Sequence, residues 1–336
     1  MKFLLLLFLL VFASCIVEGQ KLTKDTNDYI IDYSDNLGLF LYSKIKISNF
    51  SFVDETNNYR LIYSPNSQTN IGFGFNYKRV NIGIAFDLFN NDNYKYGKTK
   101  RIDWQANLYG NKAIIDILFH SYQSHYIRNP QDVFPTYVNG DPNYIRPDIL
   151  NNGFGFSYIY IFNYKKFSYR AAFLGNARQK KSNGSWFAGG GFFSENISGD
   201  SSLFPQKSYF SIYPQITSIS TFAIGLKGGY ATCIVVKKYF YLSTSLGTSV
   251  YFGKRRILND ISTMHDKNEI YGSFQPRFAV GISKEKWFAG FSVVNDFFMF
   301  SSISKTNGLS LNYQYGNARL FVGKRFNLSK TIKIFN

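Results

Sequence analysis

Cysteine, proline and histidine are all scarce in this chain. Among its 336 residues there are 2 cysteines, 8 prolines and 3 histidines. If Cys15 is removed with an export signal, Cys233 has no intrachain partner, which excludes a disulfide framework. We expect Cys233 to be a small packing residue on an apolar strand. No cluster of Cys, Asp or Glu accompanies the histidines, so the sequence predicts no metal site and no cofactor.

Long apolar runs are missing beyond the N-terminus. Residues 3–12 are apolar and follow Lys2, but this run is shorter than the roughly 20 residues that a membrane-spanning helix needs. Small residues, including Ala13 and Gly19, follow at the positions where a signal peptidase cuts. The segment 1–19 is therefore predicted to be a secretory signal. No later run approaches the length of a spanning helix, which excludes helical membrane spans.

Two processing sites stay open for this signal. The first is cleavage before Gln20. The second is lipidation of Cys15, because residues 12–15 resemble the box that precedes a lipidated bacterial cysteine, although Phe12 is atypical at its first position. Both place the mature chain outside the cytoplasm.

Acidic residues are outnumbered by basic ones, 21 to 38, which gives a formal net charge of +17. Basic residues interleaved with aromatic rings are also typical of proteins that bind single-stranded nucleic acid. The export signal argues against that class here, and the basic residues recur in short clusters rather than in a continuous patch. Solvated turns and contacts with lipid phosphates explain such clusters. We expect outer-membrane lipid, and no nucleic acid, as a partner.

Aromatic residues are abundant, with 35 Phe and 26 Tyr in the chain. Rings in such number suit a lipid-facing wall with interfacial girdles. Residues 80–89 show the clearest two-residue alternation, with apolar side chains at Val80, Ile82 and Ile84 and small or polar ones between them. A strand of this kind has a lipid side and a lumen side. Because helical spans are excluded, a closed barrel is the structure that fits membrane residence.

The same alternation recurs along the chain. It predicts strands over residues 71–77, 102–108, 153–162, 274–282 and 320–326. Short basic turns are predicted at residues 77–79, 110–112, 163–166, 236–238 and 283–286, and long polar connections at residues 90–99, 128–147 and 253–268. Tight periplasmic turns and longer surface loops are typical of outer-membrane barrels. The fold class predicted is all-β, an antiparallel transmembrane β-barrel of about 12 strands, with roughly 12 to 14 allowed.

The domain organisation predicted is a single barrel over residues 37–326. Residues 20–36 are polar and are predicted to be a periplasmic lead-in, and residues 327–336 a C-terminal tail. Pro276 lies on the apolar face of its strand and cannot donate a ladder hydrogen bond, so we expect a bulge or a strand end there. Export and a barrel together predict the outer membrane of a Gram-negative bacterium.

Four short stretches carry a resemblance to a known family. They are Tyr144-Ile145-Arg146-Pro147-Asp148, Phe167-Ser168-Tyr169-Arg170-Ala171-Ala172-Phe173, Gln179-Lys180-Lys181-Ser182 and Gly199-Asp200-Ser201-Ser202-Leu203. In this order they resemble the DUF4421 family, a domain of unknown function from Bacteroidetes-type bacteria, over most of the mature chain. The resemblance implies a signal peptide and an outer-membrane barrel. It implies no activity, ligand or catalytic residue.

Six charged residues alternate with lipid-type residues and are predicted to face the lumen. They are Asp87, Asp103, Asp116, Arg170, Lys227 and Arg277. Charges at membrane depth persist only if they are paired or hydrated, so a polar interior is implied. Two interpretations stay open. One is a salt-bridge network that fills a narrow lumen, and the other is a conducting pore that Arg170, Lys227 and Arg277 bias toward anions.

The only histidine cluster lies at residues 120–125 and also holds serines. Some outer-membrane lipid hydrolases place His and Ser on a barrel wall. Strand geometry puts Asp116 four residues from His120 on one face, too far for a direct bond, and puts Ser121 and His125 on the other face. The cluster therefore predicts neither a catalytic dyad nor a metal site, and no catalytic residue is assigned.

Three functions follow from these observations. The first is non-enzymatic passage or binding of a small polar or anionic solute. The second is a structural or surface-interaction barrel that acts through its long loops, chiefly residues 128–147, with Tyr144, Arg146 and Asp148 as candidate binding residues. The third is an outer-membrane lipid hydrolase. The sequence carries no signal for the oligomeric state.

Overall fold

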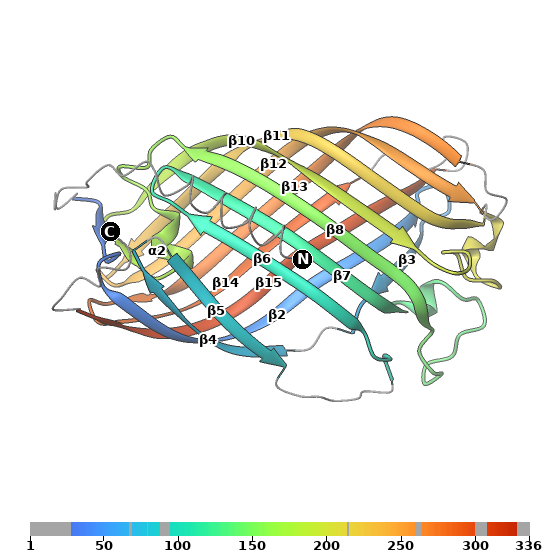
Figure 1. Cartoon of the computed structure of the whole chain (residues 1–336), viewed down its shortest axis with the longest axis horizontal. Coiled ribbons are helices and arrows are strands. Elements are labelled where there is room, and N and C mark those ends of the chain that lie inside the picture. The colour runs from blue at the N-terminus through green and yellow to red at the C-terminus, as the bar shows by residue number, and fades with distance from the viewer. Residues whose placement is uncertain are drawn as a thin grey trace, which may run out of the picture.

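A computed structural model describes residues 28–66, 69–78, 80–87, 95–213, 215–259, 264–299 and 308–327. These residues form a barrel of long, tilted antiparallel strands (Figure 1). In chain order the elements are β1 (Ile30–Asp32), β2 (Leu37–Asp54), β3 (Tyr59–Ser64), β4 (Thr69–Tyr77), β5 (Val80–Asp87), β6 (Lys100–Tyr109), β7 (Ala113–Ile127), η1 (Pro130–Asp132), β8 (Ile145–Ile161), α2 (Tyr169–Phe173), β9 (Ala177–Gln179), β10 (Asn183–Ser198), η2 (Tyr209–Ile212), β11 (Ile216–Val236), β12 (Phe240–Asn259), β13 (Met264–Ser283), β14 (Trp287–Met299) and β15 (Leu309–Phe326). Within these ranges, no helix is long and apolar enough to cross a membrane.

The strands follow the two-residue period of the sequence. On β12, Leu246, Val250 and Phe252 are exposed on the outside of the barrel, while Ser245 and Ser249 are buried inside it. Successive side chains of a strand point to opposite faces, so one strand supplies both an apolar wall and a polar lining. The all-β antiparallel barrel that the alternation predicts is confirmed. Cys233 is buried on β11, as expected of a packing residue.

Ten strands close the hydrogen-bonded ring: β2, β3, β7, β8 and β10 to β15, with β15 pairing back to β2. β3 and β4 both run antiparallel to β2, β3 along residues 50–54 and β4 along residues 38–45, so they are two parts of one interrupted strand. The described ring therefore has ten strands, and β4, β5 and β6 are additional strands that pair with β2, β4 and β7. The strand number of about 12 stays a prediction.

The wall is interrupted between β5 and β6. β5 is bonded to β4 and β6 to β7, but the described residues of β5 and β6 share no ladder (Figure 1). The ring passes this interruption through β3, which pairs with the last residues of β7. A hydrogen bond joins the two sides at one end of the gap. The backbone N–H of Asn66, which follows β3, donates to the hydroxyl of Thr99, which precedes β6, at 2.9 Å. We call this gap the β5–β6 seam.

Residues 162–182, which we call the plug, fold into one end of the barrel. The plug contains α2, seen at the left in Figure 1, and β9, which pairs with β1. Its Phe167 and Phe173 are buried inside the barrel. Arg325 of β15 holds it by donating from Nε to the Gly175 carbonyl at 2.8 Å. The predicted short basic turn at residues 163–166 is present, with the Lys166 N–H donating to the Asn163 carbonyl at 3.0 Å, but it leads into the plug and does not join two neighbouring strands of the wall. The other four predicted turns do connect successive strands.

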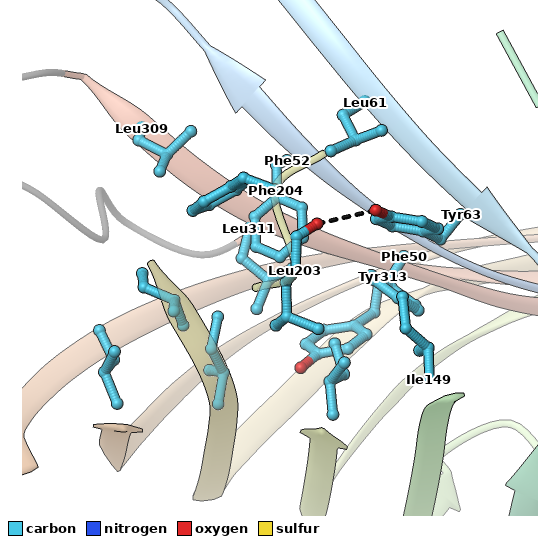
Figure 2. Close-up of a cluster of buried hydrophobic side chains, with 14 of the residues drawn as sticks. Phe50, Phe52, Leu61, Tyr63, Ile149, Leu203, Phe204, Leu309, Leu311 and Tyr313 are labelled. Atoms are coloured by element: carbon cyan, nitrogen blue, oxygen red, sulfur yellow. Dashed lines mark hydrogen bonds between the residues drawn. The ribbon is translucent and has the colours of Figure 1, made fainter. Parts of the chain in front are cut away.

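Residues 199–213, which we call the cap, fold into the opposite end. Leu203, Phe204 and Phe210 of the cap are buried among side chains of β2, β3 and β15. The Tyr63 hydroxyl donates to the Leu203 carbonyl at 2.7 Å, and Figure 2 shows this bond within the cluster. Burying each of the large apolar side chains contributes about 1.5–3 kcal/mol. The cap is therefore a packed part of the barrel interior.

Two further expectations about strands are corrected. Residues 253–268 were predicted to be a long connection, but β12 continues to Asn259 and β13 begins at Met264. Arg255 points inward there and pairs with Glu269 at 3.0 Å, while Lys254 and Arg256 are exposed on the other face of β12. Pro276 causes neither a bulge nor a strand end. Its pairing with β12 is continuous, and the ladder with β14 has the same register on both sides of it.

The predicted ends of the chain lie largely outside the described residues. This holds for the signal over residues 1–19, for both processing sites and for most of the C-terminal tail. The described part of the lead-in includes β1, which pairs with β9 of the plug. The described part of the connection 90–99 begins at Lys95.

Candidate functional site

A cavity of about 110 Å³, which we call the chamber, lies inside the barrel. Five strands supply its charged lining: Asp116 from β7, Glu195 from β10, Lys227 from β11, Arg277 from β13 and Asp296 from β14. At about 30 Å³ for each molecule, the volume corresponds to roughly four waters. The chamber is large enough for a small solute only.

The closest ion pair of the chamber crosses the lumen. Arg277 Nη2 lies 2.8 Å from Asp116 Oδ2, and Arg277 Nη1 donates to the Tyr109 hydroxyl at 3.4 Å. Lys227, also buried, lines the chamber beside this pair. Three carboxylates and two cations line the chamber.

The plug lies near this ion pair and reaches it through Tyr109. Tyr169 of α2 stacks on Tyr109 with ring centroids 6.4 Å apart, and its hydroxyl shares a hydrogen bond of 2.6 Å with Ser245 Oγ. Burial raises the pKa of Tyr169 to about 12, so the hydroxyl stays protonated at neutral pH. Tyr109 and Tyr169 therefore join the plug to the chamber by packing and neutral hydrogen bonds.

A buried histidine lies on the side of the chamber nearer the cap. His120 Nε2 is 3.0 Å from Glu195 Oε1, and the Tyr315 hydroxyl donates to the same oxygen at 2.6 Å. A Cβ at position 153 would lie 2.1 Å from His120 Cε1, so Gly153 makes room for the pair. Among the described residues, the imidazole of His120 contacts Glu195, Tyr122 and Tyr315 and no serine hydroxyl.

Strand alternation predicts that His125 points away from His120, and this prediction is wrong. Both side chains are buried inside the barrel. The reason is a bulge at Ser124, where φ is 78° and the register with β8 shifts by two residues, from Gln123 opposite Leu150 to His125 opposite Arg146. A bulge changes which face the following residues occupy. His125 instead approaches the Ile149 carbonyl through Nδ1 at 3.2 Å.

A second interior ion pair lies behind the β5–β6 seam. Lys46 Nζ of β2 is 2.9 Å from Asp103 Oδ1 of β6, and the Tyr122 hydroxyl donates to the other carboxylate oxygen. This ion pair joins β6, at one edge of the seam, to β2, which pairs with β4 on the other side of the seam. It holds β6 in place where backbone pairing with β5 is missing.

The predicted lumen charges occupy different kinds of position. Asp103 and Asp116 are on interior strand faces, as are Lys227 and Arg277, and the side chain of Asp87 lies outside the described part of the structure. Arg170 is on α2 of the plug, where it bonds Asn111 at 2.6 Å and Asp32 at 2.5 Å. The strand-like alternation around Arg170 is therefore misleading, because it belongs to a buried helix.

Of the three candidate surface-binding residues, Arg146 and Asp148 contact the cap and hold it in place. Arg146 makes a two-point contact with Asp148 at 2.8 and 2.6 Å, and donates to the Ser202 carbonyl at 2.7 Å. It also donates to the Ser201 hydroxyl at 2.9 Å. Tyr144 is partly exposed instead, against the ring of Phe134. Two of the stretches that carry the family resemblance, residues 144–148 and 199–203, thus contact each other.

Several interior residues escaped the sequence reasoning. They are Lys46, Glu195, Asp296 and Tyr315. Each of them alternates with outward residues on its strand, which is the signal that could have found them. Their partners lie on strands remote in sequence, so alternation alone could not pair them. Within the described ranges, no three His, Cys, Asp or Glu side chains lie close enough together to hold a metal ion.

The fold and its lined interior define a β-barrel of the outer-membrane type with both ends occupied. The chain belongs to the family described as a domain of unknown function, DUF4421, whose model matches residues 23–326. The predicted family membership is confirmed. No curated protein sequence matches the chain significantly.

Two solved structures match the chain over most of its length at low sequence identity. The outer membrane protease OmpT from Escherichia coli matches with a TM-score of 0.42 and 9% identity, covering 88% of this chain and 98% of its own. The toluene transporter TodX from P. putida matches with a TM-score of 0.20 and 7% identity, covering 88% and 91% of the two chains.

Proposed function

We propose that this protein is a closed outer-membrane barrel of a Gram-negative bacterium, exported by its N-terminal signal, that binds a small polar solute in the chamber. The observation that carries the proposal is a charged cavity inside a barrel whose two ends hold the packed plug and the packed cap. An open porin keeps a continuous aqueous lumen. Here buried aromatic residues occupy both ends, so passage requires displacement of the plug and of the cap.

The charge of the solute follows from the lining. Three carboxylates face two cations across a cavity of about 110 Å³. A small ammonium compound or zwitterion satisfies this set, because each ionised group of the solute meets an opposite charge. A simple anion would displace the carboxylate of Asp116 from Arg277. We therefore replace the anion preference expected from Lys227 and Arg277 by a preference for cationic or zwitterionic solutes.

Conductance in planar bilayers tests the closed state. We expect the full chain to be silent, and silent again when only the plug or only the cap is replaced by a flexible glycine-serine linker. Replacing both should open a steady conductance. Each variant is first checked for heat-modifiable migration, which reports a folded barrel. Steady conductance of the full chain, or silence of a folded variant that lacks both segments, would contradict the proposal.

Calorimetric titration tests the solute class separately. Methylammonium, glycine and acetate share a small size and differ in charge. We expect heat of binding for methylammonium or glycine and none for acetate, and loss of that heat in Asp296→Asn. Binding of acetate alone would refute the charge assignment.

A second function, surface interaction, is favoured by exposed apolar side chains in the cap and in the connection 128–147. Val138 of the connection and Ile212 of the cap are 65% and 68% exposed, and the rings of Tyr59 and Tyr209 stack 4.1 Å apart. Exposed apolar side chains on an ordered support are typical of interaction sites. Deleting residues 134–143 should then weaken binding of the barrel to a surface partner. Unchanged surface binding and an unchanged envelope phenotype would remove this function.

A further inference from the structure

Three of the five charged residues of the chamber are already satisfied within the protein. Arg277 and Asp116 pair with each other at 2.8 Å. The Glu195 carboxylate is held by His120 at 3.0 Å and by the Tyr315 hydroxyl at 2.6 Å. A buried charge that has its own partners gains little from a ligand, because binding would first have to break those contacts. These three residues therefore do not set the ligand that the chamber takes.

Lys227 and Asp296 are the two charged residues of the chamber that remain. Both line the chamber, and Lys227 is 7% exposed. Asp296 Oδ1 is buried without a hydrogen-bond partner, and the Lys227 ammonium has neither a hydrogen bond nor an ion pair within the part of the chain that the structure describes. Buried charges are normally paired or hydrated. The two residues therefore leave one positive and one negative charge available to a molecule in the chamber.

Lys227 and Asp296 are close enough to attract each other but not to pair. Lys227 is on β11 and Asp296 on β14, with β12 and β13 between them in the ring. Each is the opposite charge that acts most strongly on the other, and the two lie beyond ion-pair distance. A molecule that carries both charges and lies between them would neutralise both groups, whereas neither group neutralises the other by direct contact. The arrangement therefore favours a ligand with an anionic and a cationic end.

The hydrogen-bonding chemistry of the two groups limits the ligand further. A carboxylate only accepts hydrogen bonds, and a lysine ammonium only donates them. Asp296 therefore needs a cation that carries N–H groups, which a quaternary ammonium lacks, and Lys227 needs an anionic acceptor. The cavity of about 110 Å³ admits only a short skeleton between them, and the rings of Phe193 and Phe298 on its wall offer that skeleton apolar contact.

We propose that the solute of the chamber is a small zwitterion of the amino-acid kind, bound end to end between Asp296 and Lys227. Its ammonium group donates to Asp296, and its anionic group accepts from Lys227. A solute with one charge leaves the other residue buried and unpaired, which costs affinity. The inference rests on the proposed function, since the chamber must bind a solute, and it narrows that function from cations and zwitterions to zwitterions alone.

Three solutes with the same number of heavy atoms test the two ends separately. Glycine carries both charges, glycinamide keeps the ammonium and loses the carboxylate charge, and glycolate keeps the carboxylate and loses the ammonium. Calorimetric titration of the full-length barrel measures the Kd of each. We expect glycine to bind at least about tenfold more tightly than either of the other two, because charge-assisted hydrogen bonds form at both of its ends. Equal Kd values for glycine and glycinamide would overturn the proposal.

Two substitutions assign the ends, each in barrels first checked for heat-modifiable migration. Lys227→Met should raise the Kd of glycine to that of glycinamide, and should not raise the Kd of glycinamide, which lacks the group that Lys227 recognises. Asp296→Asn should raise the Kd of glycine to that of glycolate, and should not raise the Kd of glycolate. The conservative variant Lys227→Arg should keep the preference for glycine over glycinamide. Glycine binding that survives both Lys227→Met and Asp296→Asn would overturn the proposal.

Matched controls change the same charges away from the chamber. Lys112 and Glu55 are exposed, and Lys112→Met and Glu55→Gln should leave all three Kd values unchanged. The outcomes also separate this inference from the function on which it rests. Glycinamide that binds as tightly as glycine would refute the zwitterion and keep a chamber that binds cations, whereas no binding of any of the three solutes would refute both.

Discussion

The barrel wall differs between its two sides. From β10 to β13 the strands have 16 to 21 residues, and each is bonded to a neighbour on both edges. β5 and β6 have 8 and 10 residues, and each is bonded along a single edge. Continuous ladders fix the first wall through the backbone. The second depends on side chains of β2, such as Tyr42 and Lys46, so it can be changed without unfolding the barrel.

The largest effect is expected for the ion pair that crosses the lumen between these two sides. Arg277→Ala leaves the Asp116 carboxylate buried without its cation, and should lower the free energy of unfolding by about 3–5 kcal/mol. Denaturant unfolding in vesicles measures this. The double variant Arg277→Leu with Asp116→Leu should recover most of the loss, because it removes both charges. A loss below about 1 kcal/mol in Arg277→Ala would indicate a hydrated, exposed pair.

The cap provides the next comparison, because side chains rather than ladders hold it on the paired wall. Arg146→Ala removes the contacts with Asp148, Ser201 and Ser202, and should lower the stability of the cap by about 2 kcal/mol. Limited proteolysis within residues 199–213 measures its release. Arg146→Lys should retain only part of the cap's resistance to proteolysis, since lysine cannot make the two-point contact with Asp148. Equal resistance of wild type and Arg146→Ala would contradict the role of Arg146.

Two glycines test the walls directly. A Cβ at Gly191 of β10 would lie 2.3 Å from the Phe156 carbonyl, whereas a Cβ at Gly83 of β5 would meet the tip of the Tyr42 side chain. Gly191→Ala should therefore lower the free energy of unfolding by about 1–3 kcal/mol. Gly83→Ala should change it by less than about 0.5 kcal/mol, because the tyrosine can move. Equal losses on denaturant unfolding would mean that the seam wall is as rigid as the paired wall.

Much of the fold could be predicted because strand alternation is a local property. The inward positions of Asp116, Lys227 and Arg277 follow from the two-residue period. Their partners do not, since Asp116 and Arg277 are 161 residues apart in sequence and meet only because the ring closes. Asp296 and Glu195 are likewise recognised as chamber residues only in the tertiary structure, because ring closure brings their strands together.

The sequence-based predictions that are wrong have other physical causes. The plug sequence alternates like a strand, yet α2 has only 5 residues and is stabilised by burial inside the barrel rather than by its own propensity. The bulge at Ser124 reverses the face of His125 through a single positive φ of 78°. Residues 253–259 look like a loop because they are polar, and they form a strand because Arg255 finds Glu269 across the sheet.

What the sequence by itself determined was the class of wall: antiparallel strands with an apolar outer face, short basic turns and a charged inner face. These properties depend on neighbours one or two residues away. The tertiary structure decided what the barrel contains and where it opens. The plug, the cap, the chamber and the β5–β6 seam all arise from contacts between residues far apart in the chain, and those contacts exist only after the ring has closed.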